Sequence, residues 1–366
     1  MQRRILHVLG GLSLGGAESR IMDLYRNIDR KEIQFDFLVH SKQEEHFDSE
    51  IRKMGGNIYR VPRFRIYNYF EYRKALVTFF QTHREFSAVH GHMTSTASIY
   101  LPIAKKFGVP VTIAHARSAG VPSGMKGVIT RLLRIPLKHR ADYCLTCSKM
   151  AGVSVFGKEW VQLGKVEVIP NAIDAEKYDY SPSTREEYRK KLNLDEKWVI
   201  GHVGSFREAK NHEFLIRIFA EIRKKRTDAV LLLLGEGELM DKIKRLTEEL
   251  HLSDSVFFLG NHDNVNAYYQ AMDYLIFPSF YEGLPGTVVE AQVSGLPCLI
   301  SNTIADEVKV TDLVTAYSLQ KTAGEWAQYV LKHSVYERRS RLEEVKRAGF
   351  EIHAQIERYK QIYGGC

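Results

Sequence analysis

Short apolar runs alternate with longer amphipathic stretches along the whole chain. This alternation predicts β-strands joined by crossover helices in parallel sheets. In the first half, strands are expected at residues 4–9, 33–39, 57–61, 88–90, 109–114, 143–146 and 166–169. In the second half, they are expected at 199–203, 229–234, 255–259, 274–277, 297–300 and 315–317. The pattern therefore predicts an α/β protein.

The length indicates two domains rather than one. A chain of 366 residues exceeds what one hydrophobic core usually supports. We expect two Rossmann-like domains, an N-terminal one at residues 1–172 and a C-terminal one at 173–345. A C-terminal helix is expected within residues 346–366, as part of an amphipathic stretch that reads as helical from 339 to 363.

The charge is unevenly distributed. Residues 1–172 hold 26 Lys and Arg against 14 Asp and Glu, whereas residues 173–366 hold 26 against 30. A basic first half favours an anionic partner, either a membrane surface or a phosphorylated lipid. No nucleic-acid-binding motif is present, so we expect no nucleic acid partner.

Two basic stretches in the first half are candidate membrane contacts. Residues 126–140 combine apolar side chains with Lys and Arg in the manner of a basic amphipathic helix, and residues 63–70 are basic and aromatic. The alternative for the first stretch is a crossover helix that packs on the sheet and exposes its charged face. Both interpretations stay open at this stage.

Composition also bears on location and redox chemistry. No apolar run approaches the length of a membrane-spanning helix, and the N-terminus reads as a strand rather than a signal peptide, so a cytoplasmic protein is expected. The four cysteines are too few for a disulfide framework. Cys144 and Cys147 have metal-ligand spacing but lie in an apolar run, and we expect them to be buried.

The stretch 277–298 carries the strongest chemical signal. An apolar strand at 274–277 ends at a proline, and a loop with Gly283 and Gly286 leads into a helix from about residue 287. Free N–H groups at the start of such a helix attract an anion such as phosphate. Glu282 and Glu290 flank this turn. Each alone would suit a solvated loop or a first helical turn, but together they could accept hydrogen bonds from sugar hydroxyls.

Further polar residues follow other predicted strands, where ligands bind in open α/β sheets. His92 and His115 each follow a strand of the first half, and Arg117 comes two residues after His115. Arg207 and Lys210 follow the first strand of the second half, where two cations could converge on a diphosphate.

Glycines follow two strands as well. The first strand leads into a glycine-rich loop that contains Gly15 and Gly16, and Gly235 follows the strand at 229–234. The first loop lacks the spacing of the dinucleotide fingerprint, which weakens the hypothesis of a nicotinamide-dependent oxidoreductase.

Taken together, these motifs resemble a known family. Glu282 and Glu290, separated by seven residues in FPSFYEGLPGTVVEAQVSGLPC, resemble the E-x7-E motif of retaining glycosyltransferases of family 4. Residues 168–174 resemble the hinge I-P-N-G-I-D of that family, with Ala172 in place of its glycine. The resemblance covers essentially the whole chain and is greatest for bacterial enzymes of exopolysaccharide and capsule assembly.

The resemblance implies a GT-B fold, in which the C-terminal helix crosses back to the first domain, and it implies a role for each motif. Glu282, His115, Arg207 and Lys210 would be catalytic. The acceptor would contact His92 and Arg117. Donor-binding positions would be Gly15, Gly16, Arg207, Lys210, Gly235, Gly283, Leu284, Pro285 and Glu290.

The implied reaction is sugar transfer from a nucleotide-diphosphate sugar to an acceptor hydroxyl with retention at the anomeric carbon. A UDP-sugar is expected in preference to a GDP-sugar, and the acceptor would be a lipid-linked or free saccharide. No D-x-D motif occurs, so we expect no metal and no other cofactor. The alternatives are a sugar-nucleotide epimerase of the same architecture and a non-catalytic nucleotide-binding protein.

Overall fold

The computed structural model describes residues 2–118, 120–121 and 124–364. The chain divides into two compact units. The N-terminal unit comprises Met1–Asn171 and Ile352–Cys366, and the C-terminal unit comprises Ala172–Glu351. The last helix therefore belongs to the N-terminal unit although it lies at the far end of the sequence.

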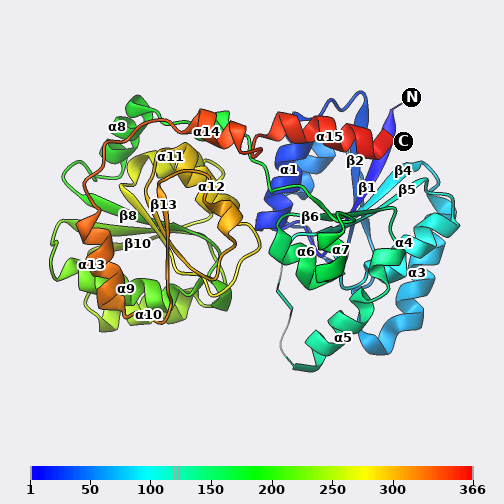
Figure 1. The fold of residues 1–366 in the computed structure, drawn as a ribbon, viewed down its shortest axis with the longest axis horizontal. Helices are drawn as coiled ribbons and strands as arrows, with labels where there is room; N and C mark the ends of the chain where they lie inside the picture. The colour runs from blue at the N-terminus through cyan, green and yellow to red at the C-terminus, as the bar shows by residue number, and fades with distance from the viewer. Residues whose placement is uncertain (1, 119, 122–123, 365–366) are drawn as a thin grey trace. The chain divides into compact units, whose positions relative to one another are not determined.

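The N-terminal unit is built on a seven-stranded parallel sheet with the strand order β3-β2-β1-β4-β5-β6-β7 (Figure 1). Its strands are β1 (Arg3–Leu9), β2 (Ile33–Val39), β3 (Ile58–Arg60), β4 (Phe86–Gly91), β5 (Val111–Ala116), β6 (Tyr143–Thr146) and β7 (Glu167–Val168). All seven residues of β2 are buried, as expected for a strand covered on both faces.

Helices connect and cover these strands. They are α1 (Gly16–Asn27), α2 (Asp48–Lys53), α3 (Tyr69–Thr82), α4 (Ala97–Lys106), α5 (Gly124–Arg134), α6 (Lys149–Phe156), α7 (Lys158–Gln162) and α15 (Ile352–Gly364), with short 3-10 turns η1 (Ile66–Asn68) and η2 (Leu137–His139). Helix α15 packs against α1 and β4 and buries Ile356, Tyr359 and Ile362.

The C-terminal unit has a six-stranded parallel sheet with the order β10-β9-β8-β11-β12-β13. Its strands are β8 (Trp198–Val203), β9 (Ala229–Leu234), β10 (Val256–Gly260), β11 (Tyr274–Phe277), β12 (Cys298–Ser301) and β13 (Val314–Tyr317). One core cluster includes Phe219 of a covering helix and Trp326 of another, both fully buried.

The helices of this unit are α8 (Pro182–Lys191), α9 (His212–Arg223), α10 (Met240–Glu249), α11 (Val265–Ala271), α12 (Gly286–Val293), α13 (Ala323–Lys332) and α14 (Leu342–Arg347), with 3-10 turns η3 (Glu176–Tyr178), η4 (Glu208–Lys210) and η5 (Asp306–Val308). The prediction of an α/β protein with two Rossmann-like domains is confirmed.

Both sheets reverse their strand order at one point. In the N-terminal unit the reversal lies between β1 and β4, and in the C-terminal unit it lies between β8 and β11. Loops at the carboxyl ends of the strands beside such a point form the usual ligand site of an open α/β sheet. The predicted site residues lie on these loops, on the strands next to them, or in the first turns of α1 and α12.

Two helical predictions were wrong in detail. Residues 126–140 do not form one helix: α5 ends at Arg134, and η2 follows Pro136, whose ring disfavours a helical conformation in the preceding residue. The C-terminal helical stretch is broken between α14 and α15 at Gly349, which has a φ of +82°. Only a backbone that tolerates positive φ makes this turn without strain.

The cysteines are buried as expected. Cys144, Cys147 and Cys298 lie buried inside the two units, and burial raises the pKa of Cys144 to about 12. Cys366 lies outside the described residues. No helix in the described part of the chain is both long enough and apolar enough to cross a membrane.

Candidate active site

Two loops of the C-terminal unit are joined at the carboxyl ends of β8 and β11. The backbone N–H of Phe280 donates to the carbonyl of Ala209 at 2.8 Å. The side-chain amide of Asn211 donates to the carbonyl of Pro278 at 3.1 Å. These bonds hold the segment with Arg207 and Lys210 against the loop that follows β11.

Lys210 and Glu282 meet across this junction. Their Nζ and Oε1 atoms lie 2.6 Å apart, and each side chain is less than one-fifth exposed. The Lys210 ammonium also lies 4.6 Å from the ring centroid of Phe277. Two residues predicted to be catalytic from separate motifs thus form one ion pair.

Arg207 lies at the start of η4. Its exposed side chain lines a cavity of about 380 Å³ together with His212 and Phe280. The sequence places Arg207 and Lys210 in one motif, but the structure directs them to different neighbours.

Helix α12 begins directly after the loop that carries Glu282. Pro285 is its N-cap and no side chain caps it, while Gly283, Leu284 and Pro285 are buried. The N–H groups of a helix's first turn have no partner within the helix, and the helix dipole makes that end attractive to anions. The predicted phosphate-binding turn therefore has the expected backbone geometry.

Glu290 lies one turn into α12 and is 6% exposed. Its Oε2 accepts a hydrogen bond from the hydroxyl of Tyr269 at 2.9 Å. Burial and the Glu290 charge hold the pKa of Tyr269 well above its usual value. Glu290 is thus a buried, oriented carboxylate and not a solvated helix residue.

Gly235 has a packing reason to be glycine. Its φ is +133°, and a Cβ there would lie 2.3 Å from the carbonyl oxygen of Gly204. The loops after β8 and β9 approach each other closely at this point, so any side chain at position 235 would separate them.

The glycine-rich loop of the N-terminal unit follows β1 and leads into α1. Gly15 is the N-cap and Gly16 the first residue of the helix, and no side chain caps it. A Cβ on Gly16 would meet nothing within 4 Å. Further back in the loop, the backbone N–H of Leu12 donates to the carboxylate of Glu45. The carboxylate of Glu45 therefore occupies this part of the loop.

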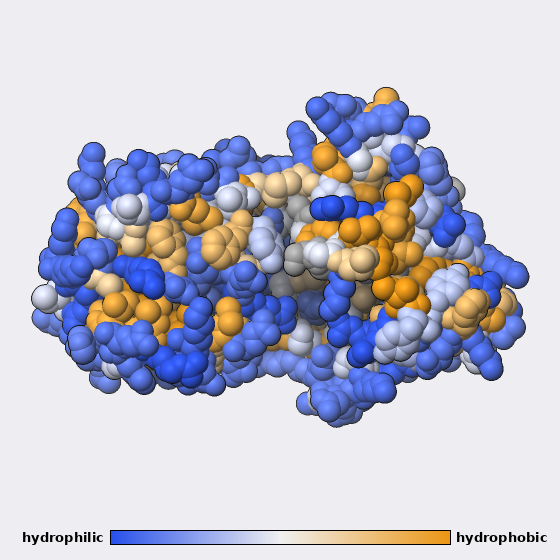
Figure 2. Space-filling model, turned by 90° about the horizontal axis from the view of Figure 1, so that it is seen from below, coloured by the Kyte–Doolittle hydropathy of each residue, from blue (hydrophilic) through white to orange (hydrophobic). Residues whose placement is uncertain are grey.

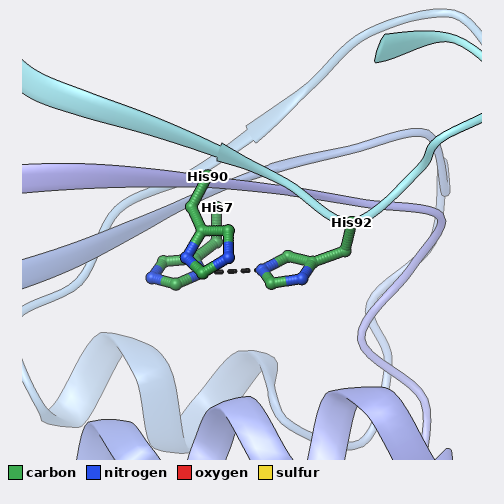
Figure 3. Close-up of side chains that lie close together, drawn as sticks. All are labelled: His7, His90 and His92. Atoms are coloured by element: carbon green, nitrogen blue, oxygen red, sulfur yellow. Dashed lines mark hydrogen bonds between the residues drawn. The ribbon is translucent and has the colours of Figure 1, made fainter. Parts of the chain in front are cut away.

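Three buried histidines and the partly exposed His92 gather where the strand order of this unit reverses. His7 lies in β1, His90 in β4 and His115 in β5, and His92 follows β4. Figure 3 shows His7, His90 and His92 close together, with a dashed bond that joins His7 to His92. The sequence singled out His92 and His115, but gave no reason to choose His7 or His90 from within their strands.

The four rings form two separate hydrogen-bonded pairs. His7 Nδ1 lies 3.0 Å from His92 Nε2, and His90 Nε2 lies 3.0 Å from His115 Nδ1. Burial, reinforced by the charge of Arg117, lowers the pKa of His7 to about 3 and that of His115 well below its usual value. The imidazoles are therefore neutral near pH 7.

Arg117 follows His115 and borders this cluster. Its Nε donates to His92 Nδ1 at 3.3 Å, and its Nη1 donates to the Asn171 side chain at 2.7 Å. The predicted acceptor residues His92 and Arg117 are thus in direct contact.

Three of these histidines are close enough together to be compared with a metal site. Ligand atoms of His7, His90 and His92 lie within 4.8 Å of one another, the one such group of three in the described part of the chain. The donors are all neutral imidazoles, and the guanidinium of Arg117 is bonded to one of them. A fixed positive charge at this distance opposes a divalent cation, so the residues present do not fit a metal well.

Comparison with known proteins assigns the family. Residues 14–177 match the profile of "Glycosyltransferase Family 4", and residues 184–344 match that of "Glycosyl transferases group 1". The chain is 33% identical to EpsF of Bacillus subtilis, whose glycosyltransferase name is provisional, over 90% of this chain and 88% of that protein. This chain belongs to glycosyltransferase family 4.

Two other curated relatives are more distant. The capsular polysaccharide biosynthesis glycosyltransferase CapH of Staphylococcus aureus is 22% identical over 98% of both chains. A UDP-Gal:alpha-D-GlcNAc-diphosphoundecaprenol alpha-1,3-galactosyltransferase of Escherichia coli is 27% identical over 63% of this chain and 62% of that protein. The family 4 relatives of this glycosyltransferase thus include enzymes of capsule assembly and of lipid-linked saccharide assembly.

A solved structure establishes the fold type. HepE of Anabaena, crystallised with UDP and glucose, superposes with a TM-score of 0.72 over 99% of this chain and 97% of its own, at 16% identity. The expected GT-B fold of this family 4 enzyme is confirmed at the level of architecture.

Proposed function

We propose that this glycosyltransferase moves a sugar from a nucleotide-diphosphate donor, preferably a UDP-sugar, to an acceptor hydroxyl, with retention and without a metal ion. The observation that carries the proposal is the Lys210–Glu282 pair, held beside the uncapped N-terminus of α12 by the joined loops. Cation, carboxylate and helix dipole together suit a phosphate attached to a sugar.

The donor diphosphate would be stabilised by positive groups of the C-terminal unit. Lys210, Arg207 and the first turn of α12 would neutralise charge as it develops on the leaving group. A diphosphate that binds Lys210 would replace Glu282 as its anionic partner. Glu282 would then be released to accept hydrogen bonds from the sugar.

The other carboxylate and the glycines would hold the rest of the donor. Glu290, oriented by Tyr269, would accept from the ribose. Gly235 keeps the loops after β8 and β9 close together. The backbone at Gly16 is open and would let the donor approach α1, whereas the Glu18 side chain lies against Gly15 and would have to move for the donor to reach it.

Retention would follow from attack on the same face from which the leaving group departs. Glu282 is paired with Lys210 and Glu290 with Tyr269, so neither is arranged as a free nucleophile. Assistance from the leaving phosphate would remove the proton of the attacking hydroxyl. His92 and Arg117 would contact the acceptor.

The proposal of metal independence is supported by the cations. Lys210, Arg207 and the α12 terminus supply the positive charge that a divalent ion would otherwise provide. The histidine cluster, the one candidate set of metal ligands among the described residues, is bordered by Arg117.

The classes of donor and acceptor are inferred from relatives. The Escherichia coli relative is named for UDP-Gal and a diphosphoundecaprenol-linked sugar, and HepE was crystallised with UDP. We therefore infer a UDP-sugar donor and a lipid-linked or saccharide acceptor for this chain.

The N-terminal unit offers a surface suited to a membrane-bound acceptor. Helix α5 exposes Met125 (74%), Val128 (49%) and Leu132 (59%), and Ile135 just beyond it is 64% exposed. Figure 2 shows apolar side chains gathered on this unit, on the right of the view, in a predominantly hydrophilic surface. Helix α5 thus lies in the crossover from β5 to β6 but leaves several of its apolar side chains exposed.

The charge beside this surface is positive. Arg134 of α5 has two buried guanidinium nitrogens with no hydrogen-bond partner among the described residues. Lys126 and Arg131 are exposed on the same helix. Apolar side chains beside unpaired cations suit the headgroups and acyl boundary of an anionic membrane. We infer that α5 brings the enzyme to the cytoplasmic face of such a membrane.

One assay tests the reaction. The protein is incubated with a panel of UDP- and GDP-sugars and a lipid-diphosphate saccharide, with and without EDTA. We expect transfer from a UDP-sugar with an unchanged anomeric configuration by NMR and an unchanged rate in EDTA. An inverted product, or activity abolished by EDTA and restored by Mn²⁺, contradicts the proposed mechanism. Isomerised donor without transfer supports an epimerase instead.

A further inference from the structure

A tyrosine of the C-terminal helix is connected to His115 by buried hydrogen bonds. The hydroxyl of Tyr363, in α15, lies 2.8 Å from His90 Nδ1. His90 Nε2 in turn lies 3.0 Å from His115 Nδ1. His90 and His115 are fully buried, and Tyr363 is 1% exposed.

The aromatic packing holds this chain of bonds in place. The Tyr363 ring stacks on Tyr359 with a centroid separation of 5.7 Å and meets Phe35 edge-on at 6.1 Å. The rings of His90 and His115 are almost parallel, at an interplanar angle of 9° and a separation of 5.2 Å. The three polar side chains therefore have little freedom to exchange partners.

The direction of the chain follows from hydrogen-bond accounting. If Tyr363 donates to His90, then His90 Nε2–H donates to His115 Nδ1, and the one group left without a partner is His115 Nε2–H. In the opposite direction, both the Tyr363 proton and the lone pair of His115 Nε2 lack partners among the described residues. Each unsatisfied buried polar group is costly, so the first direction is preferred.

The neighbouring pair of His92 and His7 forms a second chain of hydrogen bonds of the same kind. Arg117 can only donate, so its bond fixes His92 Nδ1 as an acceptor and His92 Nε2–H as the donor to His7 Nδ1. That chain also ends on a buried Nε2–H without a partner among the described residues, on His7. The direction of this pair is set by Arg117, whereas that of the His115 pair depends on Tyr363.

We propose that Tyr363 and His90 are positioning residues that hold His115 as the Nε2–H tautomer, so that His115 donates a hydrogen bond to an oxygen of the transferred sugar. The role of His115 toward the sugar rests on the proposed function, but the tautomer does not. A neutral His115 whose Nε2 carries the proton is a donor and does not serve as a general base.

The tautomer is measured directly by NMR on the full chain labelled with ¹⁵N-histidine, with His115 assigned through His115→Gln. We expect Nε2 of His115 to carry the proton in the wild-type protein. Tyr363→Phe removes the donor that sets the direction, and the His115 signal should then report a mixture of both tautomers. A wild-type Nδ1–H tautomer, or an unchanged signal in Tyr363→Phe, overturns the proposal.

Tyr72→Phe is a matched control. Tyr72 is a buried tyrosine of the same unit whose hydroxyl lies 2.9 Å from His40 Nε2, so the substitution removes the same kind of bond away from His115. Both variants should lose similar thermal stability. Only Tyr363→Phe should alter the His115 tautomer.

Kinetics provide the functional readout. Tyr363→Phe and His90→Leu should each lower kcat about tenfold, the size of one lost hydrogen bond in the transition state, with a smaller change in the donor KM. His90→Gln keeps an N–H that can donate to His115 Nδ1 and should retain most of kcat. Equal kinetics in Tyr363→Phe and Tyr72→Phe would refute the positioning role but not the proposed sugar transfer. Absent transfer in the wild type would refute the proposed function and leave the NMR result to decide the tautomer.

Discussion

At the scale of single residues, the site of the C-terminal unit is built around the ion pair of Lys210 and Glu282. In the proposed reaction, Lys210 binds the donor diphosphate and Glu282 binds the sugar. Lys210 and Glu282 neutralise each other at 2.6 Å. Both side chains are mostly buried, and the cost of removing two charges from water offsets much of their attraction, so such a pair contributes little net stability. The position of this pair beside α12 is therefore better explained by binding than by folding.

Lys210→Ala should reduce transferase activity and also cost some stability, because it leaves the mostly buried carboxylate of Glu282 without its cation. Removing the cation should weaken donor affinity and lower turnover by about an order of magnitude or more, on the scale of a lost charge-assisted contact. Arg207→Ala should act similarly. Lys190→Ala is the control, because it breaks the Lys190–Glu186 pair on α8 at 2.8 Å, outside the site. Unchanged kinetics in Lys210→Ala and Arg207→Ala would remove both residues from the mechanism.

The buried histidines should make folding sensitive to acid. The pKa of His7 is about 3 in the folded protein, lowered by burial and then by Arg117, against about 6.5 when unfolded. Between these values the unfolded chain binds a proton that the folded chain does not. The free energy of unfolding should therefore fall as the pH falls, by up to about 1.4 kcal/mol per pH unit for this group.

His7→Gln should reduce this dependence, as measured by urea unfolding between about pH 7 and pH 5. His90, His92 and His115 also have lowered pKa values, so the dependence should weaken but not vanish. His139→Gln, at an exposed position in η2, should leave the slope unchanged. The same slope in His7→Gln and the wild type would contradict the assignment.

At the scale of elements, α5 is distinctive because its apolar side chains face outward. Gly127 is the one buried residue of α5. A soluble helix normally buries its apolar stripe, so this surface calls for a partner. Apolar side chains next to the basic residues of α5 are consistent with the proposed membrane contact.

Leu132→Ser should weaken binding to anionic vesicles. The substitution removes an apolar side chain that would insert at the acyl boundary, and sedimentation with phosphatidylserine-containing liposomes at low salt measures the effect. Leu163→Ser is the control, since Leu163 has the same 59% exposure in the same unit but lies outside α5. Equal binding by both variants, or no binding by the wild type, would contradict the membrane contact.

Elements were predictable from the sequence where local signals define both ends. The strand at 274–277 was located correctly, because an apolar run lies between Asp273 and Pro278. The predicted C-terminal helix was too long, because the amphipathic pattern continues across Gly349 and does not show that a helix ends there. The likeness to family 4 indicated Glu282 and Lys210 separately, but their ion pair joins two loops distant in sequence.

The network of His7, His90 and Tyr363 could not be predicted. These residues lie within apolar strand or helix patterns, where a polar side chain usually makes an isolated local hydrogen bond. Tyr363 follows His90 by 273 positions, so no spacing rule connects them. The signal available in the sequence was weak: His90 and His92 alternate at the end of one strand and so point to one face of the sheet.

At the scale of the whole molecule, each unit has its own sheet and its own core, yet the N-terminal unit is completed by the last segment of the chain. Helix α15 buries Ile352, Ile356 and Ile362 within that unit. The C-terminal unit is instead one continuous segment, Ala172–Glu351. A substitution that destabilises α13 should therefore affect the C-terminal unit, and one that destabilises α15 should affect the N-terminal unit, although the two helices are close in sequence.

Ile362→Ala should destabilise the N-terminal unit alone. Ile362 is 1% exposed, and truncating a buried isoleucine costs about 2–5 kcal/mol. Hydrogen exchange followed by mass spectrometry should show lost protection in β1 and β4, with protection in β8 and β11 unchanged. Val330→Ala, at a fully buried position in α13 of the other unit, should give the reverse pattern.

Binding of UDP should persist in Ile362→Ala if the C-terminal unit holds the nucleotide, while transfer falls because His115 is held through α15. Loss of protection across both sheets in either variant would show that the two units fold as one.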